Sequence, residues 1–399
     1  MYLTISMEMK KMNDLISLID KNETISLRRH IHQNPELSFQ EYKTMDFICK
    51  KLDEYGIEYN SKIAGTGVLA VIYGEKDSEN CKTLLVRADI DALPIEEISD
   101  KPYASLNKGI MHACGHDAHT AILLSVCKTL NELKSEFSGC VKLLFQPGEE
   151  TTGGAKPMIE AGVLENPKVD VCIALHVDPE INSGTIRIKP GPFYASPDDF
   201  KIKVVGKSGH AAEPHNHINP ISVCAEIIST INNEFSNHDE YVVTVSTVHS
   251  GTATNIVPET AEISGTARSL TNETRVFLKD RLNEICNKIS SKYKTKYEYE
   301  FIELYPPLIN DKEIADLFYK TAIKHIGEEN CIYGGVPTMT GEDFAYFSQS
   351  VPSLLFKLGC RNEETGIVNP LHNASFDIDE SCLNTGVTLF CGFALDFLK

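Results

Sequence analysis

The sequence has no long apolar run and carries far fewer basic than acidic side chains. No apolar stretch approaches the roughly 18 residues that a membrane-spanning helix needs. The 38 lysines and arginines stand against 56 aspartates and glutamates, which gives a net charge of −18 at pH 7. Nucleic acid and anionic membranes both require a basic surface, so we expect neither as the main partner. A small-molecule partner remains.

The chain also lacks closely spaced cysteine pairs and the CxxC motif. Its 12 cysteines are spread from Cys49 to Cys391, in a chain too long to need disulfide bonds for stability. The N-terminal stretch has neither the apolar segment nor the small-residue cleavage site of a secretion signal. We therefore expect a cytoplasmic protein in which most cysteines other than Cys114 are buried free thiols.

The length of 399 residues exceeds the size at which one hydrophobic core stops growing, so two domains are expected. Strand-like and helix-like segments alternate, which is typical of a largely parallel sheet with helices on both faces. Within residues 195–306 the predicted elements instead have the order strand, helix, strand, strand, helix, strand, which is enough for a separate small domain. We predict an α/β fold with a discontinuous domain of residues 1–194 and 307–399, and an inserted α+β domain (βαββαβ, ferredoxin-like) of residues 195–306.

The stretch MHACGHDAHT, residues 111–120, places a thiol and several imidazoles close together in the chain. Cys114 and His116 are too close in sequence to share a helix face, so they must lie on a turn, where Gly115 lets the backbone bend. The residues that follow have helical periodicity, which puts Cys114 near a helix N-terminus. That position favours a thiolate, the form of cysteine that binds metal. The alternative is a buried cysteine beside loop histidines.

Polar side chains also follow three predicted buried strands. Asp91 follows the first, Glu149 and Glu150 follow the second, and His176 ends the third, over 171–176. The carboxyl ends of parallel strands meet at one sheet edge, where open α/β sheets keep their chemistry. Taken alone, the glutamate pair is more typical of a solvated loop, and His176 of a buried histidine with satisfied hydrogen bonds. Their convergence at one edge favours a functional site.

Five side chains from separate segments have the chemistry of metal ligands: Cys114, His116, Glu150, His176 and His372. A catalytic zinc ion takes three protein ligands and a water, and a bridging thiolate would let two ions share it, so a two-metal site is predicted. The donor set fits Mn, Zn, Ni or Co without choosing among them. Adjacent carboxylates diverge in an extended stretch. One can therefore bind metal while Glu149 takes a proton from the water between the ions and later delivers it to the leaving nitrogen.

Two residues of the inserted segment are candidates for a role in binding. Small neighbours of His210 permit another surface to approach it closely, although an exposed loop histidine is the alternative. In the predicted strand over 260–269, one face is apolar or small, so Arg268 points away from the core of its domain.

An ordered set of motifs resembles the M20 metallopeptidase superfamily, from about Leu27 to the C-terminus. Within it, the chain resembles the amidohydrolase branch of hippurate hydrolases, auxin-conjugate hydrolases and N-acetyl-amino-acid deacetylases. The motifs are RADIDALP (87–94), MHACGHDAHT (111–120), FQPGEE (145–150), GGAKPMIEAGVL (153–164), ALHVDP (174–179), KSGHAAEPH (207–215), NPI (219–221), GTATNIVPETAEISGTAR (251–268) and LHNASFDIDE (371–380).

The resemblance implies that the five candidate ligands bind two divalent ions in the discontinuous, catalytic domain. It also implies that Glu149 is the base and that Asp91 contacts the metal ligands without binding a metal ion itself. Other M20 branches have a metal-binding histidine two residues before this aspartate. This chain has Asp89 there, so Asp89 is not assigned as a ligand.

The resemblance further implies that the inserted domain is a lid through which the chain forms a homodimer. His210 and Asn255 would reach the partner subunit's catalytic site to stabilise the oxyanion, and Arg268 would hold the substrate carboxylate. The expected reaction is metal-dependent hydrolysis of an N-acyl L-amino acid, bearing an acetyl, benzoyl or similar acyl group, to a carboxylate and a free amino acid. A dipeptidase or carboxypeptidase, and a catalytically silent metal-binding protein, are the alternatives.

Overall fold

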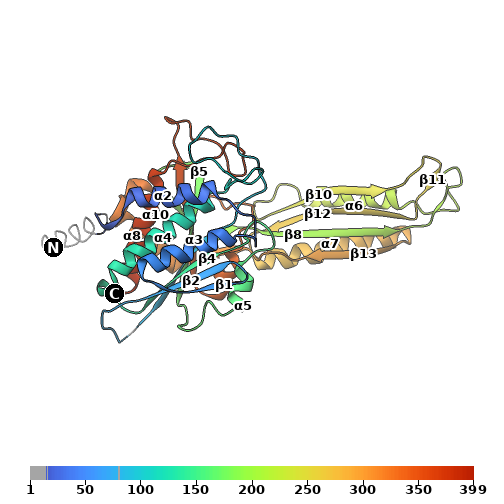
Figure 1. Ribbon diagram of the computed structural model, residues 1–399. Helices are drawn as coiled ribbons and strands as arrows, with labels where there is room; N and C mark the ends of the chain where they lie inside the picture. The colour runs from blue at the N-terminus through green and yellow to red at the C-terminus, as the bar shows by residue number, and fades with distance from the viewer. Residues whose placement is uncertain (1–14, 16, 80) are drawn as a thin grey trace. The chain divides into compact units, whose positions relative to one another are not determined.

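The computed structural model describes residue 15 and residues 17–79 and 81–399, which form two compact units (Figure 1). The first unit contains the described part of Met1–Gly191, together with Asn310–Gly335 and Tyr346–Lys399. The second contains Pro192–Ile309 and Val336–Ala345. The stretch that we searched for a secretion signal begins with residues 1–14, which lie outside the described residues.

The second unit is three residues longer at each end than the predicted inserted domain of 195–306, and it also contains Val336–Ala345, which we placed with the catalytic domain. This segment belongs to the second unit because its backbone is bonded there. Thr338 pairs with Tyr194, and the N–H of Ala195 donates to the carbonyl oxygen of Thr338 at 3.2 Å. Because the paired segments are far apart in the sequence, no pattern among neighbouring residues could have predicted this pairing.

An eight-stranded mixed sheet runs through the first unit, in the order β1-β2-β4-β3-β5-β16-β6-β15. The central strands β4, β3, β5 and β16 are parallel, whereas β1 and β2 are antiparallel at one edge. The predicted, largely parallel sheet is thereby confirmed. Its strands are β1 (Glu58–Ile63), β2 (Gly67–Tyr73), β3 (Thr83–Asp89), β4 (Cys140–Gln146), β5 (Val171–Asn182), β6 (Ile186–Ile188), β15 (Cys331–Tyr333) and β16 (Ser353–Arg361).

Helices cover both faces of this sheet. Helices α2, α3, α4, α8 and α10 pack together on one face. On the other, the ammonium group of the buried Lys142, on β4, donates to the carbonyl oxygens of Val163 and Glu165, which follow α5. The helices are α2 (Lys21–Gln33), α3 (Tyr42–Tyr55), α4 (His116–Glu132), α5 (Ala155–Glu160), α8 (Lys312–Ile326), α9 (Ala345–Ser350) and α10 (Ser381–Phe397), with the 3-10 turns η1 (Lys134–Glu136) and η2 (Glu328–Asn330).

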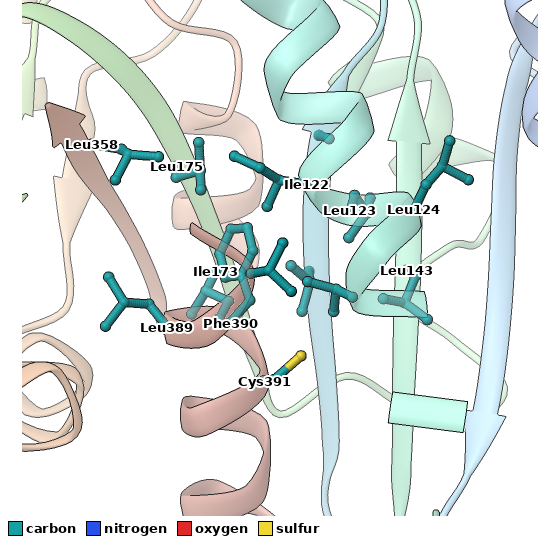
Figure 2. Close-up of a cluster of buried hydrophobic side chains, with 14 of the residues drawn as sticks. Ile122, Leu123, Leu124, Leu143, Ile173, Leu175, Leu358, Leu389, Phe390 and Cys391 are labelled. Atoms are coloured by element: carbon teal, nitrogen blue, oxygen red, sulfur yellow. The ribbon is translucent and has the colours of Figure 1, made fainter. Parts of the chain in front are cut away.

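The main core lies between the sheet and helices α4 and α10. Figure 2 shows Ile122 of α4 and Phe390 of α10 beside Ile173 of β5. Each of these side chains is fully or almost fully removed from solvent. A strand with helices on both sides reads as a continuous apolar run, which is why β3, β4 and the first half of β5 could be predicted. No helix in the described part of the chain is long and apolar enough to cross a membrane.

The second unit is an antiparallel sheet in the order β10-β12-β8-β13, with two helices. Its main elements follow the predicted order βαββαβ. Asn219 caps α6 by accepting the N–H of Ile221 at 3.0 Å, and Pro220 occupies the first helical position, where proline is favoured. Burial alternates along β12, with Arg268 on the less buried face, as predicted. The elements are β8 (Ser196–Val205), β9 (Gly209–His210), α6 (Pro220–Glu234), β10 (Tyr241–Ser250), β11 (Ile256–Val257), β12 (Thr260–Ser269), α7 (Asn272–Tyr293) and β13 (Lys296–Ile302); β7 (Gly191–Tyr194) and β14 (Leu308–Asn310) lie where the chain passes between the units.

Replacing Phe390 by alanine should lower the free energy of unfolding of the first unit by about 3–5 kcal/mol, because the surrounding helices and strands cannot close the cavity left behind. The matched control is Phe277→Ala on α7, where the residue is 48% exposed; its effect should stay within about 0.5 kcal/mol. Chemical denaturation followed by circular dichroism measures both. Similar losses in the two variants would contradict the placement of Phe390 in the core.

Candidate metal centre

The first unit brings all five predicted metal ligands into one cluster. The ligand atoms of Cys114, His116 and His176 lie within 4.8 Å of one another, and so do those of Cys114, Glu150 and His372. These two groups share the cysteine. Glu149 joins the same cluster, because it forms a third such group with His116 and Glu150.

The ends of the parallel strands explain why these residues meet. β3 and β4 are in register up to Asp89 and Gln146, so Asp91 and the glutamate pair leave the sheet at the same edge. β5 pairs with β3 only as far as Ala174, so His176 lies two residues beyond the last pair, level with the end of β3 at Asp89. We predicted that the third strand ends at His176, which is wrong. β5 continues to Asn182, because β16 pairs with it well past the end of β3.

Two backbone features place Cys114 and His372. Gly115 has a φ of +86°, a value that favours glycine, and α4 begins at the next residue. His372 has a φ of +60°, and its N–H donates to the carbonyl oxygen of Ala113 at 2.8 Å. The loop that carries His372 is thereby tied to the residue before Cys114.

Hydrogen bonds fix which nitrogen of two histidines faces the cluster. The Nδ1 of His176 lies 2.7 Å from the carbonyl oxygen of Val177. A carbonyl only accepts, so Nδ1 carries the hydrogen, and the lone pair is on Nε2, 3.4 Å from the Cys114 sulfur. The Nδ1 of His116 likewise lies 2.9 Å from the carbonyl oxygen of Asp91 and 3.2 Å from its carboxylate. In their neutral forms both histidines therefore present an Nε2 lone pair, as metal ligands do.

Two buried polar atoms of the cluster have no hydrogen-bond partner among the described residues. They are Nε2 of His116 and Oε1 of Glu150, 3.8 Å apart. The Nε2 of His372 lies 3.4 Å from the same carboxylate oxygen. Leaving buried acceptors unsatisfied is costly. Sulfur, nitrogen and oxygen acceptors aimed at one small space therefore fit a divalent cation.

Burial and neighbouring charges shift the pKa values of three candidate ligands. Burial, and then the charge of Glu150, raise the pKa of the Cys114 thiol well above its ordinary value. Desolvation therefore opposes the thiolate that we expected the helix N-terminus to favour, whereas a bound cation would favour it. Burial lowers the pKa of His176 well below its ordinary value, which keeps its lone pair free. Burial opposes charge on His116, but Asp89 and its other neighbours raise its pKa.

Two aspartates contact the candidate ligands without belonging to the predicted set of five. The Asp91 carboxylate contacts His116 and also accepts the N–H of Glu150 at 3.0 Å, so it orients two candidate ligands. Asp89 forms a group with His116 and His119 that could itself hold a metal ion. However, its carboxylate lies 2.7 Å from the guanidinium of Arg87 and 2.6 Å from the Nδ1 of His119. These contacts occupy Asp89, in keeping with our decision not to assign it as a ligand. Sequence reasoning missed His119, although its spacing of three from His116 on a helix puts both on one face.

The candidate residues of the second unit lie at opposite ends of its sheet. His210 is opposite Ile256 in the β9–β11 pair, and the N–H of Ala211 donates to the carbonyl oxygen of Asn255 at 3.1 Å, so His210 and Asn255 are neighbours. Both are exposed. Arg268 is near the far end of β12, and a strand rises about 3.3 Å per residue, so about 26 Å separates it from the first residue of β12, on the side of β11. The structure does not bring Arg268 together with the other two.

Comparison with known proteins identifies the family of this chain. The family model described as "Peptidase family M20/M25/M40" matches residues 85–396. The chain belongs to this family. An M20 chain is a metal-dependent hydrolase that acts on amide or peptide bonds.

Similar M20 proteins cover nearly the whole chain. Thermostable carboxypeptidase 2 of Saccharolobus solfataricus is 39% identical, over 94% of this chain and 95% of its own length. N-acetyl-L-cysteine deacetylase of Bacillus subtilis is 38% identical, over 96% of this chain and 89% of its own length. The crystal structure of the YXEP protein of Bacillus subtilis, described as a dinuclear metal binding peptidase of the M20 family, has a TM-score of 0.82 at 33% identity and covers 95% of this chain and 98% of that one.

A buried arginine joins two ligand-bearing segments of this M20 chain. Arg28 of α2 is fully buried, and its guanidinium lies 2.7 Å from the carboxylate of Asp117 and 2.8 Å from that of Asp377. Asp117 directly follows the candidate ligand His116, and Asp377 is in the segment that follows His372. Burial opposes the charge of Asp117, but Arg28 and then His32 hold its pKa well below its ordinary value. Arg28 therefore connects the α4 turn to the His372 segment.

Arg28→Met should lower the free energy of unfolding by about 3–5 kcal/mol at neutral pH, because it leaves the Asp117 carboxylate buried without its cation. The matched control is Arg29→Met. Arg29 pairs with Glu380 but is 44% exposed, so its loss should cost about 1 kcal/mol or less. Denaturation with urea measures both variants.

The pH dependence of this difference has a definite sign. Because the folded pKa of Asp117 is depressed, its contribution is complete above the unfolded value of about 3.9 and is lost as pH falls below it. The gap between wild type and Arg28→Met should therefore narrow below about pH 4. A gap that widens on acidification would contradict the ion-pair assignment.

Proposed function

We propose that the chain hydrolyses the amide bond of N-acyl L-amino acids, with an acetyl, benzoyl or similar acyl group, to a carboxylate and a free amino acid. The observation that carries this proposal is Glu149 in one group with His116 and Glu150, beside the Cys114 cluster. The likeness to the N-acetyl-L-cysteine deacetylase over nearly the whole chain supports the choice of substrate class.

We propose that two divalent ions occupy the cluster, and Mn, Zn, Ni and Co all suit its donor atoms. Bound there, the ions would polarise the amide carbonyl and acidify the attacking water. The side chains proposed to hold them are Cys114, His116, Glu150, His176 and His372.

Glu149 acts as the general base in this proposal. Its carboxylate takes a proton from the attacking water, whose oxygen bonds to the acyl carbon, and passes the proton to the nitrogen as the carbon–nitrogen bond breaks. Asp91 keeps His116 and the Glu150 turn in place while the proton moves.

The second unit supplies the remaining groups in this proposal. The N–H of Ala212 donates to Nδ1 of His210 at 3.1 Å, so the neutral ring carries its hydrogen on Nε2. That hydrogen and the Asn255 amide are suitable donors for the oxyanion. Arg268 offers a guanidinium fork to the substrate carboxylate.

The separation of these residues supports a homodimer in which His210 and Asn255 serve the partner subunit. A small N-acyl amino acid cannot span a distance of about 26 Å along β12, so one second unit cannot place both ends of the sheet on one substrate. The end that carries Arg268 lies at the chain connection, because Ser269 pairs with Ser196, the first residue of β8. Arg268 is therefore assigned to its own subunit.

The free edge of β10 supports dimerisation through the second unit. β10 pairs with β12 on one side and is at the sheet edge on the other. Its sequence, YVVTVSTVHS, has neither the lysine nor the proline that protects many edge strands, and Val242 and Val248 are exposed. A second copy of the same strand fits such an edge. We also propose a cytoplasmic location, because all 12 cysteines are free and Cys114 must stay reduced to bind metal.

Carboxypeptidase activity is the second candidate. The likeness to thermostable carboxypeptidase 2 covers nearly the whole chain, and both reactions place a substrate carboxylate where Arg268 can bind it. Rates on acetyl and benzoyl amino acids, compared with those on dipeptides, decide between the two.

Glu149→Gln should reduce turnover at least about 10²–10⁴-fold, because the amide cannot accept the proton. The variant should bind as much metal as wild type after reconstitution with Mn, Co, Ni or Zn, because the ligands are intact. Release of free amino acid from an acyl-amino-acid panel, with elemental analysis of bound metal, measures both properties. Wild-type turnover in this variant would overturn the assigned base.

Mixing two inactive variants should restore activity if His210 acts in the partner's site. A heterodimer of Glu149→Gln and His210→Ala has one site with both groups intact, so random pairing should recover about a quarter of wild-type turnover. Each variant alone should stay inactive. No recovery, with subunit exchange confirmed by mass spectrometry, would place His210 in the site of its own subunit.

A further inference from the structure

Both backbone groups of Val177 are bonded to histidine side chains instead of a neighbouring strand. Its N–H donates to Nε2 of His119 at 3.0 Å, and its carbonyl oxygen accepts from Nδ1 of His176 at 2.7 Å. β3 stops pairing with β5 at Ala174, so no strand from that side reaches Val177. Buried backbone groups need partners, and the two imidazoles supply them.

These bonds fix the state of His119. Its Nε2 accepts from Val177, so the hydrogen of the neutral ring is on Nδ1, which donates to Asp89 at 2.6 Å. Asp89 is held in turn by Arg87 at 2.7 Å, and its backbone carbonyl accepts from Thr120 at 3.0 Å. Asp89 and His119 are both buried, which excludes water as a competing partner. Since both nitrogens of His119 are occupied, it cannot itself be a metal ligand in this arrangement.

The ring of His119 also packs against two candidate ligands. Its centroid lies 4.9 Å from that of His176, at an interplanar angle of 67°, and 5.4 Å from that of His116. A change at position 119 therefore removes the hydrogen bond to the backbone of Val177 and also a packing contact of the His176 ring.

We propose that His119 is a positioning residue, which anchors β5 at Val177 so that Nε2 of His176 points at the Cys114 sulfur. Asp89 holds His119 in the tautomer that makes this anchor. The inference rests on the metal-binding role proposed for His176. It assigns a use to Asp89 at the position where other M20 branches have a ligand.

Two substitutions of His119 separate its two hydrogen bonds. Glutamine reaches about as far as Nε2 and can accept the N–H of Val177, whereas asparagine places a donor near Asp89 but is too short to reach Val177. His119→Asn should weaken the binding of one Co²⁺ ion to the metal-free protein about 10–100-fold, and it should change the visible absorption of the Co²⁺ that Cys114 and His176 share. His119→Gln should restore most of the affinity and the spectrum.

The control variant is His325→Gln, which alters another largely buried histidine of the first unit, packed against Gly392 of α10. It should leave the affinity for Co²⁺ and the visible absorption of the bound Co²⁺ unchanged. Wild-type Co²⁺ affinity and absorption in His119→Asn would overturn the proposal, and so would equal weakening in His119→Asn and His325→Gln. Because the readout is metal binding, these outcomes are distinct from failure of the proposed function, which would appear as wild-type protein that binds Co²⁺ but releases no amino acid from the substrate panel.

Discussion

The site depends on a concentration of lone pairs and negative charge in a buried space. The Cys114 sulfur, a Glu150 oxygen and histidine ring nitrogens approach one another there, and Nε2 of His116 and Oε1 of Glu150 have no hydrogen-bond partner among the described residues. Groups of this kind are stable together in a low-dielectric interior when a cation lies among them. M20 hydrolases are metal-dependent, so a cation bound among these groups would serve both the stability of the cluster and its chemistry.

The unequal lengths of the central strands decide where this cluster forms. β5 continues beyond the end of β3. There the backbone N–H and carbonyl of Val177 bond to the imidazoles of His119 on α4 and His176 on β5. Behind the cluster, Arg28 ties the start of α4 to the segment after His372. Of the candidate ligands, His176 is thus carried by the sheet and His116 by α4, whereas His372 is on a partly exposed loop, where its N–H donates to the carbonyl oxygen of Ala113.

The second unit divides its candidate residues between two ends of one antiparallel sheet. His210 and Asn255 are adjacent because β9 pairs with β11, and Arg268 is near the opposite end of β12. A single-chain arrangement that used all three on one small substrate would require the sheet to be much shorter. The dimer proposed above removes that conflict, since each copy contributes one end of its sheet to each site.

The sequence by itself determined the elements whose signals are local. The strand over 260–269 was predicted because alternation of burial involves neighbouring residues. It also determined which side chains could bind metal. Only the tertiary structure decided the true end of β5, the pairing of Thr338 with Tyr194, the burial that raises the pKa of the Cys114 thiol, and the hydrogen bonds of His119. Each of these depends on which backbone groups remain unpaired, or how much water is excluded, when distant segments pack together, and neither quantity is encoded by residues adjacent in the chain.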